Sequence, residues 1–328
     1  MWAITSYYNP IQYATKLRNF RVFQEHLKVP LIVVEFSREG VFELDETLCD
    51  IHIKLCDGDV LWQKEALLNV GIKHVPAEED YVTLVDADVL FTNLNWVEQT
   101  EMALQDSLIV QPFSQVRDLD KTTSENRDQI RQSIVRPFEH ETLDIENSEL
   151  GGHRNSFAKS YIEGQLNNGF FDSLGQRQNT AIAPGFSIAG KKKFFEKFPL
   201  FDEAIIGGGD SLFWDALAGE AINMAQQRGL RGNYRERYLS WASRIHKAVG
   251  KSINYVEGNL LHLWHGELES RGYYSREFKL NDIGYDPSKD LIRSSEGIWK
   301  WTDERTDLRE YLNDYFFGRK EDFLSAKV

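Results

Sequence analysis

Residues 81–88 read Tyr81-Val82-Thr83-Leu84-Val85-Asp86-Ala87-Asp88, an apolar run that ends in two acids. A short run of this kind predicts a strand that is buried on both faces. Similar runs lie earlier in the chain, at residues 3–7 and 31–36, and apolar residues at helical spacing follow each of them, at residues 12–27 and 60–70. This alternation predicts an α/β fold with a Rossmann-like, mainly parallel sheet and helices on both faces.

Asp86 and Asp88 follow the third predicted strand directly, at the edge where open α/β sheets bind ligands. Two carboxylates at one point repel anions, so they need a divalent cation before they can hold a phosphate group. Mg²⁺ and Mn²⁺ suit carboxylate ligands and keep coordination positions for phosphate oxygens. The pair therefore predicts a metal site. The alternative is two solvated acids in a loop.

A second candidate is the run Gly207-Gly208-Gly209-Asp210-Ser211, which precedes a helical pattern at residues 211–218. Three glycines permit positive φ angles and let the backbone approach a ligand closely. Asp210 is placed to act as a general base at such a bend. In the alternative interpretation, Asp210 or Ser211 only caps the helix that follows.

A third candidate is His262-Leu263-Trp264-His265-Gly266. If these residues continue a strand, the two histidines face opposite sides, so that at most one of them points to a site. The alternative is a buried, hydrogen-bonded histidine beside a packed tryptophan.

The fourth candidate, Thr5-Ser6-Tyr7-Tyr8-Asn9-Pro10, ends the first predicted strand. Its hydroxyl groups could hydrogen-bond a nucleobase on which a tyrosine stacks, or the stretch could be an ordinary turn at Asn9-Pro10. The glycine-rich patterns of dinucleotide-binding and P-loop proteins do not occur in the sequence.

Taken in order, these motifs resemble GT-A-fold, nucleotide-sugar-dependent glycosyltransferases, most closely the family-2-like enzymes of bacteria and their phages. The resemblance covers residues 1–112 and 181–275. The motifs that carry it are Thr5-Ser6-Tyr7, Trp62-Gln63-Lys64-Glu65-Ala66-Leu67-Leu68-Asn69 with Gly71, Val85-Asp86-Ala87-Asp88, Pro184-Gly185-Phe186-Ser187-Ile188-Ala189, Leu200-Phe201-Asp202-Glu203, Gly207-Gly208-Gly209-Asp210 and His262-Leu263-Trp264-His265-Gly266.

The resemblance implies a metal-dependent transfer of a sugar from a nucleotide-diphosphate sugar, expected to be a UDP-sugar, to an acceptor hydroxyl with inversion. It implies Mn²⁺ or Mg²⁺ on Asp86, Asp88 and His265, with His262 as the second choice, and Asp210 as the base. The single acid Asp210, followed by Ser211, departs from the acidic pair of inverting relatives.

The remaining residues that the resemblance suggests lie around the two substrates. The donor-binding residues are expected to be Thr5, Ser6, Tyr7, Arg18, Lys64, Asp86 and Asp88, and those on the acceptor side Gly208, Gly209 and Trp264. Surface solvation is the alternative for the cations Arg18 and Lys64.

The chain divides by character into four parts. Residues 1–112 form the expected nucleotide-sugar half and residues 181–275 the acceptor half. Residues 113–180 are polar, with weak apolar periodicity, and predict an insertion with marginal helices that could include a lid. Residues 276–328 carry aromatic residues at helical spacing, among them Trp299 and Trp301, and predict a helical tail.

Charge is distributed unevenly along the 328 residues, whose formal net charge is −13. Residues 228–251 hold seven basic residues against the single acid Glu236, a net charge of +6, with Tyr234, Tyr238 and Trp241 between them. This pattern is typical of a solvated helix face. The second interpretation is a polyanionic acceptor, which would make the protein a phage-type DNA glycosyltransferase acting on a hydroxymethylated base such as hydroxymethylcytosine.

Other features bound the class of protein. The longest apolar run is too short to cross a membrane, no signal peptide is visible, and Cys49 and Cys56 lack the partners of a zinc site, so a cytoplasmic protein with free thiols is expected. A nucleotidyltransferase would use a similar acidic pair, but it needs an early glycine-rich basic loop that is missing here. An inactive sugar-binding protein would lack the acids that this sequence keeps.

Overall fold

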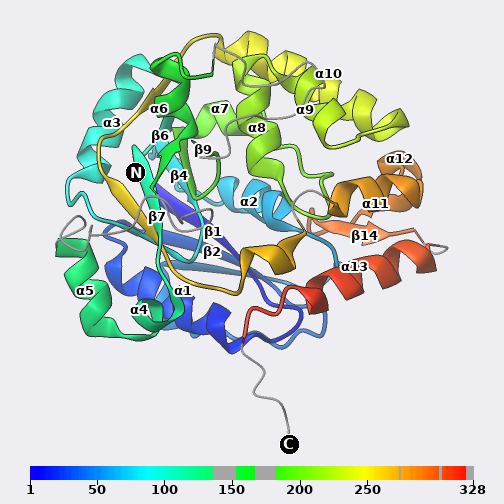
Figure 1. The fold of residues 1–328 in the computed structure, drawn as a ribbon, viewed down its shortest axis with the longest axis horizontal. Coiled ribbons are helices and arrows are strands. Elements are labelled where there is room, and N and C mark those ends of the chain that lie inside the picture. Colours follow the sequence, from blue (N-terminus) through cyan, green and yellow to red (C-terminus); the bar gives the residue numbers. More distant parts are fainter. Residues whose placement is uncertain (136–152, 167–181, 273–274, 303–304, 323–328) are drawn as a thin grey trace, which may run out of the picture.

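The structure is a computed structural model that describes residues 1–135, 153–166, 182–272, 275–302 and 305–322. Within these residues, seven strands form a central sheet in the order β11-β6-β10-β4-β1-β2-β3 (Figure 1). The strands are β1 (Trp2–Tyr8), β2 (Leu31–Phe36), β3 (Ile51–Leu55), β4 (Tyr81–Val85), β6 (Ile109–Gln111), β10 (Ser187–Lys191) and β11 (Ile253–Tyr255).

The sheet is mainly parallel, as predicted. β1 pairs in parallel with β2 and β4, β2 with β3, and β6 with β11. The exception is β10, which lies between β4 and β6 and runs antiparallel to both. The α/β class is therefore confirmed, in the form of a mixed sheet.

Alternation along the strands explains why helices cover both faces of this sheet. Ile4, Ile32 and Val34 pack on the side that also buries Leu67 of α2 (Lys64–Ile72). Their neighbours Ala3 and Val33 pack on the other side, against the phenylalanines of α1 (Ala14–His26). Successive residues of a strand point to opposite faces, so a strand buried on both faces is apolar throughout.

Most predicted elements of residues 1–112 are present, and the helix predicted at 60–70 is displaced to residues 64–72. Gly71 was expected to end this helix, but it lies inside the helix. A Cβ there would lie 2.4 Å from Ile4 Cγ2, so glycine is needed for close packing of α2 on β1. The sequence analysis missed β3, β6 and α3 (Trp96–Asp106), which are short or polar on one face.

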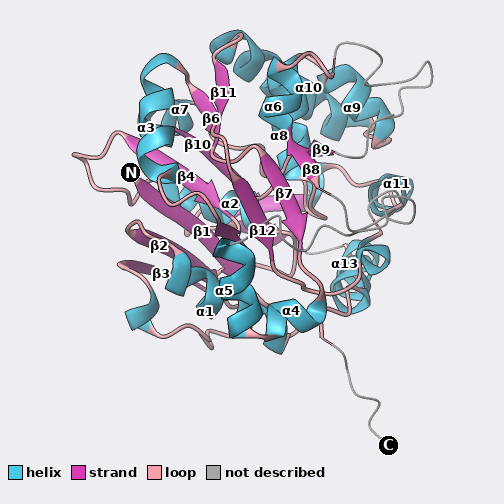
Figure 2. Cartoon of the chain, turned by 60° about the vertical axis from the view of Figure 1, so that its left-hand side comes forward, coloured by secondary structure: helices cyan, strands magenta, loops and turns pink. Residues whose placement is uncertain are grey.

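A second, five-stranded sheet lies beside the first, in the order β5-β12-β7-β8-β9 (Figure 2). Its strands are β5 (Val89–Phe91), β12 (Asn259–His262), β7 (Gln115–Asp118), β8 (Arg154–Ser156) and β9 (Ile182–Ala183). Residues 113–180 thus supply β7 and β8, together with α4 (Lys121–Glu125), α5 (Arg127–Val135) and α6 (Phe157–Ile162). The predicted lid falls on residues 136–152 and 167–181, which lie outside the described residues.

The second half of the chain is mainly helical. The strand predicted at 181–189 is divided into β9 and β10 by Pro184-Gly185-Phe186. The helices are α7 (Lys192–Lys197), α8 (Gly209–Ala218), α9 (Ala221–Gln227), α10 (Gly232–Val249), α11 (Arg276–Asp282), α12 (Pro287–Asp290) and α13 (Thr306–Gly318).

The tail predicted as helical contains α11, α12 and α13, and it also contains two strands that the prediction did not include. β13 (Leu291–Arg293) and β14 (Trp299–Trp301) form an antiparallel hairpin between α12 and α13. Trp299 and Trp301 are buried on either side of the less buried Lys300, an alternation with the period of a strand rather than of a helix.

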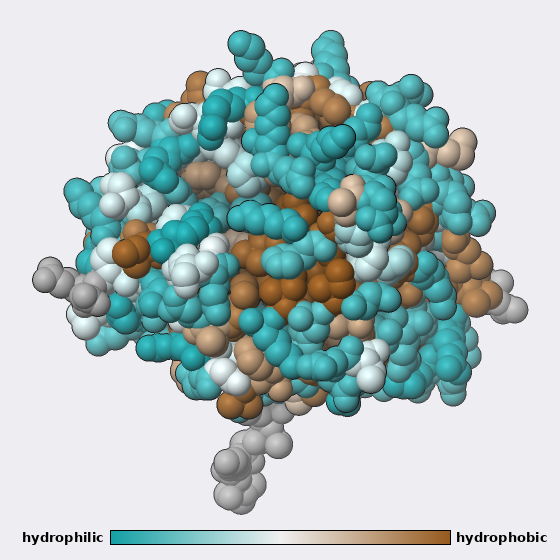
Figure 3. All heavy atoms as spheres, turned by 180° about the vertical axis from the view of Figure 1, so that it is seen from behind, coloured by the Kyte–Doolittle hydropathy of each residue, from teal (hydrophilic) through white to brown (hydrophobic). Residues whose placement is uncertain are grey.

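Figure 3 shows the molecule from behind, with apolar side chains gathered in the middle of that face inside a rim of polar ones. None of the helices in the described part of the chain has both the length and the apolar character that crossing a membrane requires.

Candidate metal centre and active site

Strand pairing places three potential metal ligands together. Asp88 immediately precedes β5, and His262 is the last residue of β12. β5 and β12 are antiparallel with Val89 opposite His262, and Leu263 N donates to Asp88 O at 2.8 Å. The chain turns after β12 and brings His265 back to the same point.

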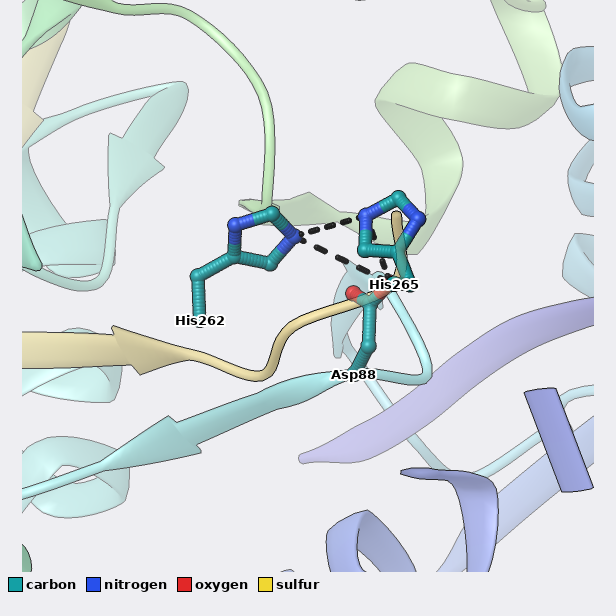
Figure 4. A group of neighbouring side chains, drawn as sticks. All are labelled: Asp88, His262 and His265. Carbon is teal, nitrogen blue, oxygen red and sulfur yellow. Dashed lines mark hydrogen bonds and ion pairs between the residues drawn. The ribbon is translucent and has the colours of Figure 1, made fainter. Parts of the chain in front are cut away.

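Asp88, His262 and His265 point toward one another (Figure 4), with one ligand atom of each within 4.8 Å of the others. The two Nε2 atoms lie 3.0 Å apart, and Asp88 Oδ2 lies 3.4 Å from Nε2 of His265 and 3.8 Å from that of His262. The histidines would face opposite sides only on a continuous strand, but β12 ends at His262 and the strand alternation ends with it. Both histidines join Asp88, whereas Asp86 does not belong to the group.

The outer nitrogen of His262 is held by a carboxylate. Nδ1 lies 2.6 Å from Asp118 Oδ1, and Arg154 in turn donates to Asp118 at 2.6 and 2.8 Å. His262 and Asp118 are opposite each other in the parallel β12–β7 pair, so the sheet register creates this contact. Although burial opposes it, the hydrogen bond to His262 and the nearby Arg154 lower the pKa of Asp118. A carboxylate that orients the outer nitrogen in this way is typical of metal-binding histidines.

The other groups around His265 are charged. Arg271 Nη2 lies 3.0 Å from its Nε2 and 3.3 Å from its Nδ1, and Glu321 Oε1 lies 3.8 Å from its Nδ1. Burial and Arg271 lower the pKa of His265 to about 4, so the imidazole is neutral at pH 7, as a metal ligand must be. Burial acts to raise the pKa of Asp88, but His265 and His262 outweigh it and keep this pKa below its usual value.

One carboxylate and two imidazoles fit a divalent transition metal. Asp88 Oδ1 is buried without a hydrogen-bond partner among the described residues, which leaves a carboxylate oxygen available. Imidazole ligands favour Mn²⁺ and later transition metals over Mg²⁺, which prefers oxygen ligands. The contact of Arg271 opposes a cation, because a metal ion would take the lone pair of His265 Nε2, which lies 3.0 Å from the guanidinium.

Asp86 and Asp210 form a separate cluster through one lysine. Lys64 Nζ lies 2.6 Å from Asp86 Oδ1 and donates to both carboxylate oxygens of Asp210, at 3.0 and 3.1 Å. Burial raises the pKa of Asp86 to about 6 despite the attraction of Lys64. The same burial acts to lower the pKa of Lys64, but Asp210 and Asp86 outweigh it and raise this pKa. The three residues that were predicted from distant motifs are therefore in contact.

A small pocket adjoins this cluster, with a volume of about 20 Å³. That is room for about one water molecule, so a sugar ring requires side chains to move. Its lining residues are Lys64, Glu65, Leu68, Leu84, Asp86, Phe186, Ser187, Ile188, Leu200, Phe201, Gly209, Asp210 and Phe213.

Phe186 connects the two clusters. Its ring lines the pocket and packs edge-on against His262, with the ring centroids 4.9 Å apart. Its carbonyl accepts a hydrogen bond from Asp86 N at 2.8 Å. Its φ of 79° is unfavourable for a bulky residue and is the kind of backbone strain that gathers at functional sites.

The glycine run has a different role from the expected one. Gly207 and Gly208 have φ of 90°, and a Cβ on Gly208 would lie 2.0 Å from Arg228 Nη1. A Cβ on Gly209 would lie 2.2 Å from Glu65 Oε1. The glycines thus make room for buried charged side chains. Asp210 does not cap α8 either, because Gly208 is the N-cap residue and no side chain caps the helix.

The N-terminal candidates are largely structural. Thr5 is fully buried in β1, and Ser6 is partly buried beside it. The ring of Tyr7 packs against Phe20 and its hydroxyl donates to Glu43 at 2.7 Å, so its face is not available to stack on a nucleobase. On α1, Arg18 pairs with Glu125 at 2.8 Å. Of the late motif, Trp264 is partly exposed and lies under the ammonium group of Lys121.

The basic stretch also differs from the DNA-binding interpretation. Tyr234, Tyr238 and Trp241 are buried in the core under α10, so they cannot stack on bases. Arg228 pairs with Glu277 at 2.6 Å and Arg237 with Glu203 at 2.7 Å. The cations that remain exposed or partly exposed, without an ion pair among the described residues, are Arg235, Arg244, Lys247 and Lys251.

Sequence reasoning missed the residues that support the centre: Asp118, Arg154, Glu65, Arg271 and Glu321. They come from different parts of the chain, and all but Glu65 have no motif around them. Only Glu65, next to Lys64 in a quoted motif, had a local signal. Searched against models of known protein families, the sequence matches none, and no curated protein matches it either.

Proposed function

We propose that this protein is a metal-dependent glycosyltransferase that moves a sugar from a nucleotide-diphosphate sugar, expected to be a UDP-sugar, to an acceptor hydroxyl. The observation that carries the proposal is the placement of two clusters beyond the end of β4: Asp88 with two histidines, and Asp86 with Lys64 and Asp210. The mixed, mainly parallel sheet agrees with the GT-A fold that the motifs resemble.

The first cluster suits the leaving group. When the C–O bond between the sugar and the diphosphate breaks, negative charge grows on the diphosphate. A divalent cation on Asp88, His262 and His265 would stabilise that charge as a Lewis acid. Arg271, which has to leave His265 Nε2 in that state, would remain close enough to add a positive charge next to the phosphates.

The second cluster suits the acceptor. Asp210 takes the proton of the acceptor hydroxyl as its oxygen attacks the anomeric carbon, which inverts the configuration. Lys64 fixes Asp210 and Asp86 in one arrangement through its three contacts of 2.6 to 3.1 Å. The strained Phe186 contacts both clusters, because it lines the pocket beside Asp210 and packs on His262.

The test is a panel of nucleotide sugars with Mg²⁺, Mn²⁺, Zn²⁺ and Fe²⁺, read by release of the nucleoside diphosphate. We expect release of the nucleoside diphosphate to require a metal ion and to be faster with Mn²⁺ than with Mg²⁺. Excess chelator should abolish this release. Full activity in chelator contradicts the metal assignment, and the absence of turnover and of thermal shift with every donor contradicts the function.

A further inference from the structure

A second carboxylate faces the metal centre from the end of the described chain. Glu321 follows α13, its side chain is only 1% exposed, and its Oε1 lies 3.8 Å from His265 Nδ1. Its other partners are Arg319 Nε at 2.5 Å and Lys16 Nζ at 3.7 Å. A buried charge is stabilised when it is paired and hydrogen-bonded, and Arg319 supplies that pair for Glu321. The feature to explain is therefore the position of this carboxylate beside His265.

The chain segment that carries Glu321, residues 319–322, is fixed at both sides. It lies against Gly266, where a Cβ would be 3.0 Å from Glu321 Cα and 3.2 Å from Arg319 O. Beyond Glu321, the carboxylate of Asp322 accepts hydrogen bonds from the first backbone N–H groups of α1, at 2.6 Å from Ala14 and 2.8 Å from Thr15. These contacts hold Glu321 next to His265.

The two histidines therefore have matching surroundings. Each has Nε2 directed to Asp88 and a carboxylate on the side of Nδ1, partly buried Asp118 at 2.6 Å for His262 and buried Glu321 at 3.8 Å for His265. A carboxylate on the outer nitrogen favours the tautomer with a proton on Nδ1, which leaves the lone pair of Nε2 for a metal ion.

We propose that Glu321 is a positioning residue of the metal centre, and that residues 319–322 complete this centre by orienting His265. The distance of 3.8 Å exceeds the usual hydrogen-bond range of about 2.7–3.2 Å, so His265 has to turn toward Glu321 when a cation binds. Arg271, now 3.3 Å from the same nitrogen, has to yield in that step.

The proposal rests on the proposed metal site, and its test measures metal binding rather than turnover. Mn²⁺ is titrated into the full chain and the free ion is followed by electron paramagnetic resonance. We expect Glu321→Gln to raise the Mn²⁺ dissociation constant about 10- to 100-fold, the usual effect of such a partner. Glu310→Gln is the matched control, since it makes the same change at an exposed glutamate of α13, and it should leave the constant unchanged.

A double-mutant cycle separates positioning from a general loss of structure. In the His265→Ala background, Glu321→Gln should have no further effect on Mn²⁺ affinity, because the ring that it orients is missing. An equal loss in both backgrounds, or no loss in the wild-type background, overturns the role of Glu321. If the wild-type protein binds no Mn²⁺, the metal site itself is wrong, which is a different outcome.

Discussion

His262 and His265 direct their Nε2 atoms at one another across 3.0 Å. Asp118 binds the outer nitrogen of His262, which places the lone pair of that ring on the Nε2 side. Two imidazole lone pairs at this distance repel each other unless a proton or a cation lies between them. The two nitrogens therefore share either a proton or a cation, and the proposed metal ion is the second case, with Asp88 as the third ligand.

Asp88 and Asp86 should differ in their effect on metal binding, although the two belong to one motif. Asp88→Asn removes a ligand and should abolish measurable Mn²⁺ binding and donor turnover. Asp86→Asn should retain most of the Mn²⁺ affinity, because this carboxylate contacts Lys64 rather than the histidines. Calorimetric titration with Mn²⁺ compares the two variants. An equal loss of Mn²⁺ affinity in both would mean that Asp86 is also a metal ligand.

Asp210→Asn should lower turnover at least about a hundredfold, because the acceptor hydroxyl loses its base. Donor affinity should survive, since Asp210 contacts Lys64 and is not one of the three proposed metal ligands. The measurement is transfer rate and donor binding side by side. Ser211→Ala is the control at the adjacent position, and near-normal turnover of Asp210→Asn would mean that the base is another group.

Arg271→Gln should tighten Mn²⁺ binding in the absence of donor, since the guanidinium lies 3.0 Å from a metal-binding nitrogen. We expect a gain of roughly tenfold or more, because like charges about 4 Å apart near a protein surface repel by up to about 4 kcal/mol. The same variant should lower the rate with donor, as the leaving group loses a positive charge. Arg293→Gln is the control for the loss of one positive charge, because Arg293 is a surface arginine stacked on Trp299. Tighter Mn²⁺ binding in both variants would contradict a specific effect of Arg271 on His265.

Glu65 should make stability fall with rising pH. Burial raises the pKa of Glu65 to about 8 from an ordinary value of 4.5. Between these two values the folded state binds the proton more tightly than the unfolded state, so the free energy of unfolding decreases by up to about 1.4 kcal/mol per pH unit as pH rises. Glu65→Gln should remove this decrease, whereas the matched substitution Glu78→Gln, at an exposed glutamate, should leave it in place. Urea unfolding at pH 5 to 8 gives the free energy of unfolding of each variant. If this free energy depends on pH in the same way for wild type and Glu65→Gln, the pKa of Glu65 is not raised.

Tyr238 provides a test of the basic stretch. Its hydroxyl donates to Leu212 O at 3.0 Å inside the core. Tyr238→Phe should therefore cost about 1–3 kcal/mol of unfolding free energy and leave any salt-dependent DNA binding unchanged. Arg244→Gln, at an exposed position of the same helix, should leave stability unchanged. Weaker DNA binding by Tyr238→Phe without a loss of stability would mean that the hydroxyl contacts DNA rather than Leu212 O.

The parts of the fold that sequence predicts are those with a strong local pattern. β1, β2 and β4 are apolar on both faces, and α1 has a clear apolar side. The second sheet was not predicted, because its strands have two to four residues and pair across long distances in the chain. Trp299 and Trp301 were assigned to the helical tail, although their spacing of two residues is the period of a strand, and in the structure they pair with β13.

The site was predicted in part for the same reason. Asp86, Asp88 and Asp210 stand out next to a buried strand or a glycine run, and the structure does bring these regions together. Asp88 rather than Asp86 lies with the histidines because β12 ends at His262 and because Lys64 contacts Asp86. No local sequence pattern predicts either feature. Asp118 and Glu321 act on histidines more than fifty residues away, a relation that no local motif can encode.

The position of β10 far along the chain from its neighbour β4 has a consequence for biosynthesis. Because β10 lies between β4 and β6, the growing chain has to extend from Val85 to Lys191 before the outer edge of β4 is covered. Until then, an apolar strand edge is open to pairing with other chains, which is a known route to aggregation. We therefore expect residues 1–112, produced alone, to be insoluble even though they include most of the parallel strands, and we expect nascent chains of this length to depend on chaperones.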